Sequence, residues 1–187
     1  MCLSLVGSEM CIRDSLSNLI SGFRSGVDFR LATLNTFSGN TVISTSANLV
    51  LTGKSDRGEQ LLPKDNEIFN NIFRTNGGRH FSATGLCASS ECGNTFDTGA
   101  ITPGQNIVGG PNLGGNFWSD FQGEDANNDG IIDVPFMING DANYIDRFPL
   151  IQQQLEIVVN DDADEPDADP NDGLPLSLIH ISEPTRL

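Results

Sequence analysis

The sequence predicts an all-β chain in which short strands stack as the turns of a solenoid. Gly and Asn are abundant, and no 3.6-residue apolar periodicity persists along the chain. The pattern N-x-Φ-x-x-N-x-Φ, where Φ is apolar, occurs at 35–42 and again at 66–73. An aromatic-rich segment, 109–150, follows these repeats. Because a single turn cannot bury its own inward face, such repeats favour a parallel β-helix, a single-stranded solenoid with one continuous core.

Both ends of the chain resemble translated sequencing-adapter DNA. One short duplex encodes Leu5–Asp14 on one strand, as CTC GTG GGC TCG GAG ATG TGT ATA AGA GAC, and Ser177–Thr185 on the other. We therefore exclude residues 1–15 and 176–187 from fold reasoning. Neither end has the basic region followed by a long apolar run that is typical of a signal peptide. The native part keeps one histidine and two cysteines, and we expect it to be a fragment of a longer protein.

The charge balance restricts the partners and the location. The formal net charge is −15 at pH 7, and an acidic stretch at 160–173 carries much of it. Nucleic acids and anionic membranes need a basic footprint, so we expect neither nucleic-acid binding nor membrane insertion. We expect a secreted, periplasmic or cell-surface protein whose partners are polysaccharides or other domains of the same chain. The oligomeric state stays open.

Residues 16–108 are expected to form the β-helix coils. Alternating apolar residues at 27–31 and the run 47–51 predict strands. In the two copies of the repeat, we expect Phe37, Val42, Ile68 and Phe73 to point inward. Asn40 and Asn71 should stack at a bend, because Asn accepts left-handed backbone and can bond the Asn of the next turn. Excursion loops are expected near 53–65 and 74–104.

The second excursion carries the native cysteines and histidine. Cys87 and Cys92 are four residues apart, and we expect a disulfide in an oxidising compartment; two thiols and a metal site are the alternatives. A tetrahedral metal site would need a second pair of ligands, which the sequence does not supply nearby. His80 has no acid or histidine at catalytic or ligand spacing, so it is expected to be a loop histidine.

Residues 109–150 are expected to form a terminal coil and cap. The aromatic side chains should cover the last coil, since an open β edge must be covered; sugar stacking is the alternative function for them. The expected cap residues are Phe117, Trp118, Phe121 and Phe136.

An Asp/Asn loop within this cap is a candidate cation site. It presents oxygen side chains at positions 1, 3, 5 and 9 with Gly at position 6, as in the first part of a calcium loop. Phe136 stands where an EF-hand has its bidentate Glu, so Asp120 or Glu124 would fill the remaining places. We expect calcium with a Kd of ~10⁻⁴–10⁻³ M; the alternative is a turn held by side-chain-to-backbone hydrogen bonds without an ion. The expected ligands are Asp125, Asn127, Asp129, Ile131 and Asp133.

Three motifs in the cap carry a family resemblance. GNFWSDF at 115–121, a loop ending in DVPF at 133–136, and FPL at 148–150 resemble the terminal segment of NosD-type proteins, in the pectate-lyase-like group of carbohydrate-associated β-helices. The resemblance implies a right-handed parallel β-helix, of which this chain holds the C-terminal coils and cap. It also implies, by the family name, a role in copper handling. Copper sites use His, Met and Cys, and the native part offers only His80, Met137 and the cysteine pair.

The sequence is consistent with three functions. The first is a non-catalytic part of a secreted or cell-surface β-helix, structural or carbohydrate-associated, with a calcium-stabilised cap loop. The second is the terminal part of a polysaccharide lyase, hydrolase or epimerase whose catalytic coils lie upstream, and the third is accessory periplasmic copper handling. No catalytic residue is assigned, and we expect no activity in this fragment. Residues 151–175 are expected to be a trailing segment and a disordered acidic linker.

Overall fold

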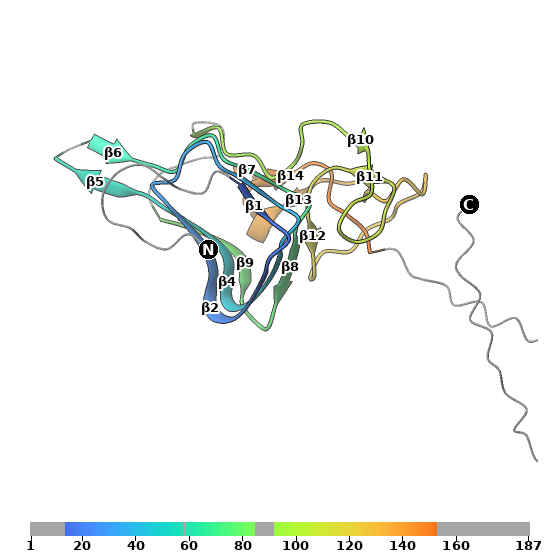
Figure 1. The fold of residues 1–187 in the computed structure, drawn as a ribbon, viewed down its shortest axis with the longest axis horizontal. Helices are drawn as coiled ribbons and strands as arrows, with labels where there is room; N and C mark the ends of the chain where they lie inside the picture. Colours follow the sequence, from blue (N-terminus) through green and yellow to red (C-terminus); the bar gives the residue numbers. More distant parts are fainter. Residues whose placement is uncertain (1–13, 58, 85–91, 153–187) are drawn as a thin grey trace, which may run out of the picture. The chain divides into compact units, whose positions relative to one another are not determined.

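The computed structural model describes residues 14–57, 59–84 and 92–152, all within the first of two compact units, residues 1–153 (Figure 1). The regular secondary structure of the described part is almost entirely β-strand, joined by turns and irregular segments. In chain order its elements are β1 (Asp14–Leu16), β2 (Leu19–Arg30), β3 (Thr36–Ser38), β4 (Thr41–Thr52), β5 (Lys54–Asp56), β6 (Glu59–Leu61), β7 (Glu67–Phe69), β8 (Ile72–Thr75), β9 (Arg79–Thr84), β10 (Thr102–Pro103), β11 (Asn112–Leu113), β12 (Phe117–Trp118), β13 (Phe136–Met137), the 3-10 helix η1 (Ile138–Gly140) and β14 (Ile145–Asp146).

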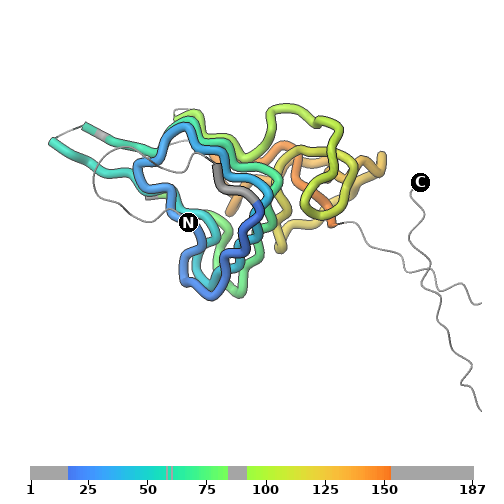
Figure 2. The backbone as a smooth tube through the Cα atoms, in the orientation of Figure 1, coloured from blue at the N-terminus to red at the C-terminus, as the bar shows by residue number. Residues whose placement is uncertain are grey.

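Parallel strands stack in three columns. The first column is β1–β3–β7, which a parallel bridge between Glu67 and Thr95 extends. The second column is formed by β12, β8 and the first halves of β4 and β2, and the third by β9 and the second halves of β4 and β2. Successive passes of the chain therefore run side by side, as the tube in Figure 2 shows. The fold is all-β with parallel strands, as the sequence predicts.

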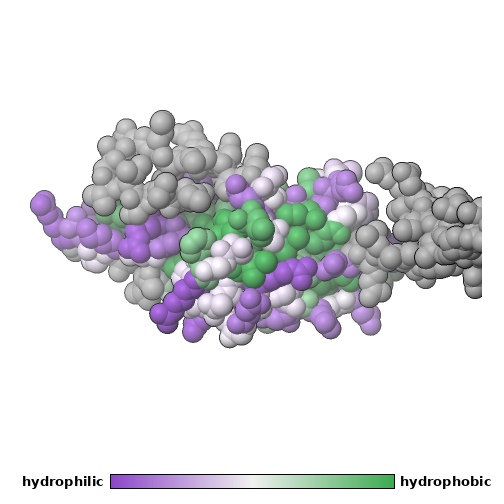
Figure 3. Space-filling view, turned by 60° about the horizontal axis from the view of Figure 1, so that its bottom comes forward, coloured by the Kyte–Doolittle hydropathy of each residue, from purple (hydrophilic) through white to green (hydrophobic). Residues whose placement is uncertain are grey.

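The core lies between the three columns. Phe37 pairs with Ile68 and Val42 with Phe73 in the parallel register, and all four side chains are buried. The expectation that these four point inward is confirmed. Each pass places an apolar side chain directly over that of the previous pass, so the apolar surface removed from water is continuous along the stack. In Figure 3 hydrophobic atoms gather in the middle of one face, with hydrophilic atoms around them.

Two ladders of asparagine side chains join the passes at the bends. In one ladder, Asn18, Asn40 and Asn71 each donate from Nδ2 to Oδ1 of the next member, over 3.0, 3.1 and 2.9 Å, and the last acceptor is Asn116. In the other, Asn35 donates to Asn66 and Asn66 to Asn94, both over 2.8 Å. The predicted stacking of Asn40 on Asn71 is confirmed. The ladder members from Asn35 onward are buried, so these bonds satisfy polar groups that water cannot reach.

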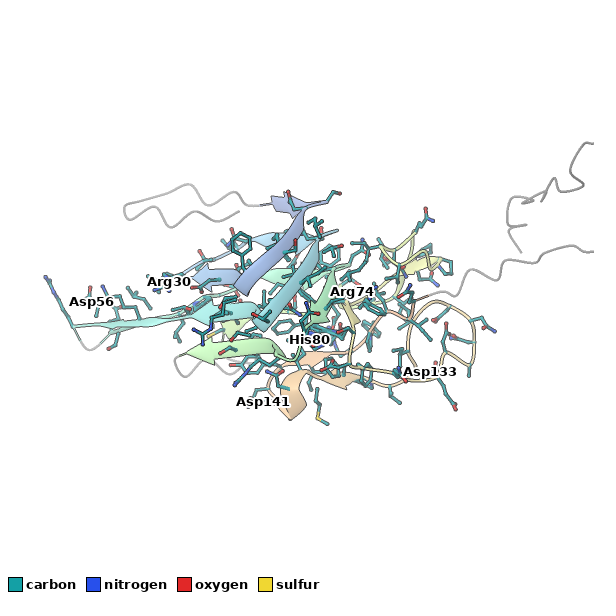
Figure 4. The ribbon with its side chains drawn as sticks, turned by 90° about the horizontal axis from the view of Figure 1, so that it is seen from below. Arg30, Asp56, Arg74, His80, Asp133 and Asp141 are labelled. Carbon is teal, nitrogen blue, oxygen red and sulfur yellow. The ribbon has the colours of Figure 1, made fainter. Side chains whose placement is uncertain are left out.

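Two stretches differ from the expected irregular loops. The first excursion contains an antiparallel hairpin of β5 and β6, whose tip carries Asp56 far from the columns (Figure 4). The second contains β9, which pairs with β4 and brings His80 into the core. The expectation of a loop histidine is therefore wrong. Polar residues flank His80, so the sequence shows no strand pattern there. The strand forms because β9 pairs with β4, which lies in another pass of the chain.

Candidate functional site

The end of the first asparagine ladder is a buried polar site at which several hydrogen bonds converge on one carboxylate. Asp146 in β14 is fully buried and takes the place that Asn holds in the earlier passes. Its Oδ2 accepts hydrogen bonds from the backbone N–H of Asn116 over 2.7 Å and from the indole Nε1 of Trp118 over 2.8 Å. Its Oδ1 accepts from the N–H of Phe148 over 3.1 Å. All of these partners are donors, so an acceptor-only side chain suits the position.

Burial and hydrogen bonding act on Asp146 in opposite directions. Burial is the larger effect and raises its pKa, the three N–H donors lower it, and the net result is a pKa raised to about 7. The same carboxylate excludes a side chain at position 115. A Cβ on Gly115 would lie 1.7 Å from Asp146 Oδ1, so this contact requires glycine at position 115.

Trp118 covers the core beside this carboxylate. Its ring stacks on Phe73 at 4.7 Å between centroids and contacts Phe136 at 5.3 Å. Phe121 lies 4.5 Å from Phe136, so three of the four expected cap residues and Phe73 form one aromatic cluster. Phe117 points the other way and is only half-buried, because neighbouring strand residues face opposite sides.

A salt bridge fixes the chain next to Asp146. Asp97 has a buried carboxylate that accepts from Arg147 Nη2 at 2.5 Å and from Arg147 Nε at 3.0 Å. It also accepts from the backbone N–H groups of Arg147 and Gly99. Burial by itself would raise the pKa of Asp97, but these hydrogen bonds outweigh it and the pKa is lowered.

His80 belongs to a chain of polar side chains that leads from the core to the surface. Ser44 Oγ donates to Asn48 Oδ1 over 2.7 Å, and Asn48 Nδ2 lies 3.0 Å from His80 Nδ1. His80 Nε2 contacts Asp120 Oδ1, and Asp120 is exposed. Figure 4 labels His80 in the middle of the molecule. The sequence did not reveal this pair because Asp120 is 40 residues away along the chain.

The donors around His80 define its tautomer. Because Asn48 uses its oxygen for Ser44, its Nδ2 must donate to His80 Nδ1, and the remaining ring proton is then on Nε2, facing Asp120. The imidazole is neutral in this arrangement. Burial is the larger effect on it and lowers its pKa, while the charge and hydrogen bond of Asp120 act to raise it. Both ring nitrogens have partners, so His80 is a structural link between β9 and the residues after β12.

The Asp/Asn loop is held by its own side chains. Asp125 accepts from the N–H of Asp129 over 3.0 Å and from that of Gly130 over 2.9 Å. Asp129 accepts from the N–H of Ile131 and from Asn127 Nδ2, each over 2.9 Å. Asp133 Oδ2 accepts from the N–H of Ala126 over 2.9 Å. These bonds bring the five expected ligand residues into one compact loop and leave several oxygen lone pairs of the carboxylates for another partner.

Cys92 is buried and disulfide-bonded. The expected partner, Cys87, lies outside the described residues, so the pairing itself stays a prediction. The trailing segment after Gln152 and the acidic linker also lie outside the described residues.

A groove opens beside β12, on the outer face of the stack. Its volume is about 350 Å³, and Phe117, Ser119 and Phe121 lie along it. Gln122, Gln152, one glycine and three aliphatic residues also line it. None of its lining residues is charged.

A family model described as "Periplasmic copper-binding protein (NosD)" matches residues 11–123, which is more than half of the chain. The chain belongs to this NosD family. A search of curated proteins and a search of solved structures found no match. Membership in a periplasmic family confirms the expected location outside the cytoplasm, secreted or periplasmic. No helix among the described residues has the length and apolar character needed to cross a membrane.

The described residues do not fit a copper site. Both ring nitrogens of His80 are engaged, Cys92 is disulfide-bonded, and Met137 is a single half-exposed thioether. Within 14–57, 59–84 and 92–152 there is also no group of three or more His, Cys, Asp or Glu side chains arranged to hold a metal ion. Copper prefers His, Met and Cys in combination, and these donors are not combined here.

Proposed function

We propose that this NosD-family chain forms the last coils and cap of a right-handed parallel β-helix that acts as a non-catalytic scaffold outside the cytoplasm. The observation that carries the proposal is the ladder from Asn18 to Asp146, in which each pass of the chain supplies one member. A ladder of this kind fixes the register of stacked passes and favours a rigid rod. Such a rod can hold binding surfaces, including surfaces for polysaccharide, at fixed spacing.

Two carboxylates of the described part, those of Asp28 and Asp97, are engaged within the chain, which supports a non-catalytic role for them. Asp28 accepts from Thr52 and Arg30, and Asp97 is paired with Arg147. Catalysis of glycosidic cleavage by acid and base requires two carboxylates that face one substrate. The acids named here are instead directed at groups of their own chain.

Incubation of the full chain with a panel of neutral and uronate polysaccharides tests this proposal. We expect no new reducing ends and no unsaturated uronate products above a boiled control. Turnover that disappears in Asp120→Asn but persists in the surface control Asp56→Asn would refute the scaffold role and favour the enzymatic alternative. A crystal structure with left-handed winding would independently refute the right-handed assignment.

We also propose that the loop 125–133 binds calcium and thereby stabilises the cap. Three carboxylates lie in a nine-residue loop already shaped by hydrogen bonds, and a divalent cation would offset their mutual repulsion. The absence of a three-member ligand group among the described side chains counts against a tight site. We therefore expect weak binding, with a Kd of ~10⁻⁴–10⁻³ M.

Copper binding is the second candidate function, favoured by the description of the family. A titration of the full chain with Cu(I) and Cu(II), read by competition with a chromophoric chelator, tests it. Because the described donors do not fit copper, we expect no stoichiometric binding. Stoichiometric binding that is lost in His80→Gln would refute our reading of His80 as a structural link.

A further inference from the structure

We propose that the groove beside β12 binds one sugar ring of a polysaccharide chain. The proposal rests on the scaffold role above and names the ligand of one of its surfaces. At about 350 Å³ the groove lies at the small end of ligand sites, which suits a single ring with part of its neighbours.

Neighbouring side chains of β12 point to opposite faces, so its two aromatic residues have different surroundings. Trp118 points inward and is almost completely buried, whereas Phe117 and Ser119 lie along the groove on the outer side. Core packing therefore explains Trp118 but not Phe117. Phe121 contacts Phe136 in the aromatic cluster and also lines the groove.

The lining of the groove suits a sugar ring better than an ion or a nucleic acid. Phe117 and Phe121 offer aromatic surface for the C–H faces of a pyranose. Ser119, Gln122 and Gln152 offer hydroxyl and amide groups that can exchange hydrogen bonds with ring hydroxyls. In a chain with a net charge of −15, this lining contains no Asp or Glu. A hard cation needs anionic oxygen ligands and a nucleic acid needs several cations, and the lining provides neither.

The positively charged side chain of Arg74 lies at the edge of the groove. The guanidinium of Arg74 lies over the Phe117 ring, 5.4 Å from its centroid, and Arg74 Nη2 is 3.4 Å from Gln152 Oε1. Arg74 is exposed and on β8, the strand next to β12. A uronate carboxylate on a bound ring would gain a charge-assisted bond from Arg74 that a neutral sugar would not.

The wall of the groove is fixed before any ligand binds. Ser119 N–H donates to Phe73 O over 3.0 Å, and Ser119 Oγ accepts from the N–H of Thr75 over 3.2 Å. The next residue, Asp120, is bonded to buried His80. Because these bonds already hold the segment in place, little conformational entropy is lost when a ligand binds, which favours affinity.

Isothermal titration of the full chain with two probes, cellohexaose as the neutral glycan and hexagalacturonate as the uronate glycan, tests the proposal. A single ring of about a dozen heavy atoms predicts a Kd of about 1 mM. Phe117→Ala should weaken binding at least ten-fold, and Phe23→Ala, an exposed aromatic on β2, should leave it unchanged. Arg74→Gln should weaken binding of the uronate probe at least three-fold more than that of the neutral probe, because only the uronate offers a carboxylate to the guanidinium.

Three results would overturn the proposal. They are no heat from either probe at 10-fold above the expected Kd, equal affinity in Phe117→Ala, and equal loss in Phe23→Ala. If Phe117→Ala unfolds, as judged by its melting curve, Gln152→Ala replaces it and should weaken binding about three-fold. Cleavage of a probe would refute the scaffold role and leave the groove assigned, whereas absence of binding with a normal melting curve would refute the groove alone.

Discussion

The titration of Asp146 should make the stability of this chain fall as the pH rises from 4 to 7. Its folded pKa is about 7 against an unfolded value of 3.8. A raised pKa means that the folded state holds the proton more tightly, so its stabilisation is complete below pH 4 and is lost as the pH rises through 7. The difference of about three units corresponds to about 4 kcal/mol in the free energy of unfolding, with a slope of about 1.4 kcal/mol per pH unit between the two values.

The variant Asp146→Asn isolates this contribution. Its side-chain oxygen can still accept from Asn116 and Trp118, but its amide would face the N–H of Phe148, so one hydrogen bond is lost at a cost of about 1–3 kcal/mol. The asparagine side chain does not titrate, so position 146 gives the variant no pH dependence of its own. Other groups titrate in both proteins: the pKa values of His80 and Asp97 are lowered, so both groups reduce stability at acidic pH. The difference between wild type and variant removes these shared effects.

Urea unfolding between pH 4.5 and 8.5, followed by tryptophan fluorescence, measures the difference. Trp118 is the only tryptophan and donates to Asp146, so its emission reports on this site directly. We expect wild type to be the more stable protein at pH 4.5, and the gap to shrink or reverse by pH 8.5. A gap that stays constant across this range would show that the pKa of Asp146 is not raised and would refute the reasoning.

Three further predictions concern the ladder, the salt bridge and the loop. Asn71→Ala removes the side chain that joins Asn40 to Asn116. It should lower the free energy of unfolding, measured in urea melts, by about 3–5 kcal/mol. The exposed control Asn143→Ala should change it by less than about 0.5 kcal/mol. Asp97→Ala leaves the Arg147 and Gly99 donors without their acceptor and should lower the free energy of unfolding in urea melts by about 2–4 kcal/mol at pH 7. Because the pKa of Asp97 is lowered in the folded state, this loss should diminish as the pH falls below 4. Millimolar calcium should raise the melting temperature of wild type but not of Asp129→Asn, and equal shifts in both would remove the proposed loop site.

The repeat could be predicted where one pass of the chain has a constant length. Asn40 and Asn71 are 31 residues apart, as are Asn35 and Asn66, so the sequence shows the period directly. The next step of the first ladder, from Asn71 to Asn116, spans 45 residues because the second excursion, which contains β9, intervenes. No periodic pattern could identify Asn116 as the next member.

The polar contacts of the site were harder to foresee than its aromatic residues. Trp118 and its neighbours stand out by composition, and the structure places Trp118 over Phe73. The pair His80 and Asp120 joins β9 to the residues after β12, which belong to another pass, and neither residue has a local partner that would reveal the contact. A hydrogen bond between side chains depends on which residues the fold brings together, which the residue types do not indicate.

The direction of the asparagine ladder gives a physical reason for the buried carboxylate at its end. Each asparagine accepts on its oxygen from the previous pass and donates from its amide to the next, so the ladder runs one way from Asn18 to Asn116. An asparagine at position 146 would bring an amide donor to a place where the neighbouring groups are themselves donors. The ionised carboxylate of Asp146 only accepts, and it satisfies Asn116, Trp118 and Phe148 together, at the cost of its desolvation. The cap therefore differs from a further repeat in the chemistry of one side chain, and this difference ends the ladder with its donors satisfied.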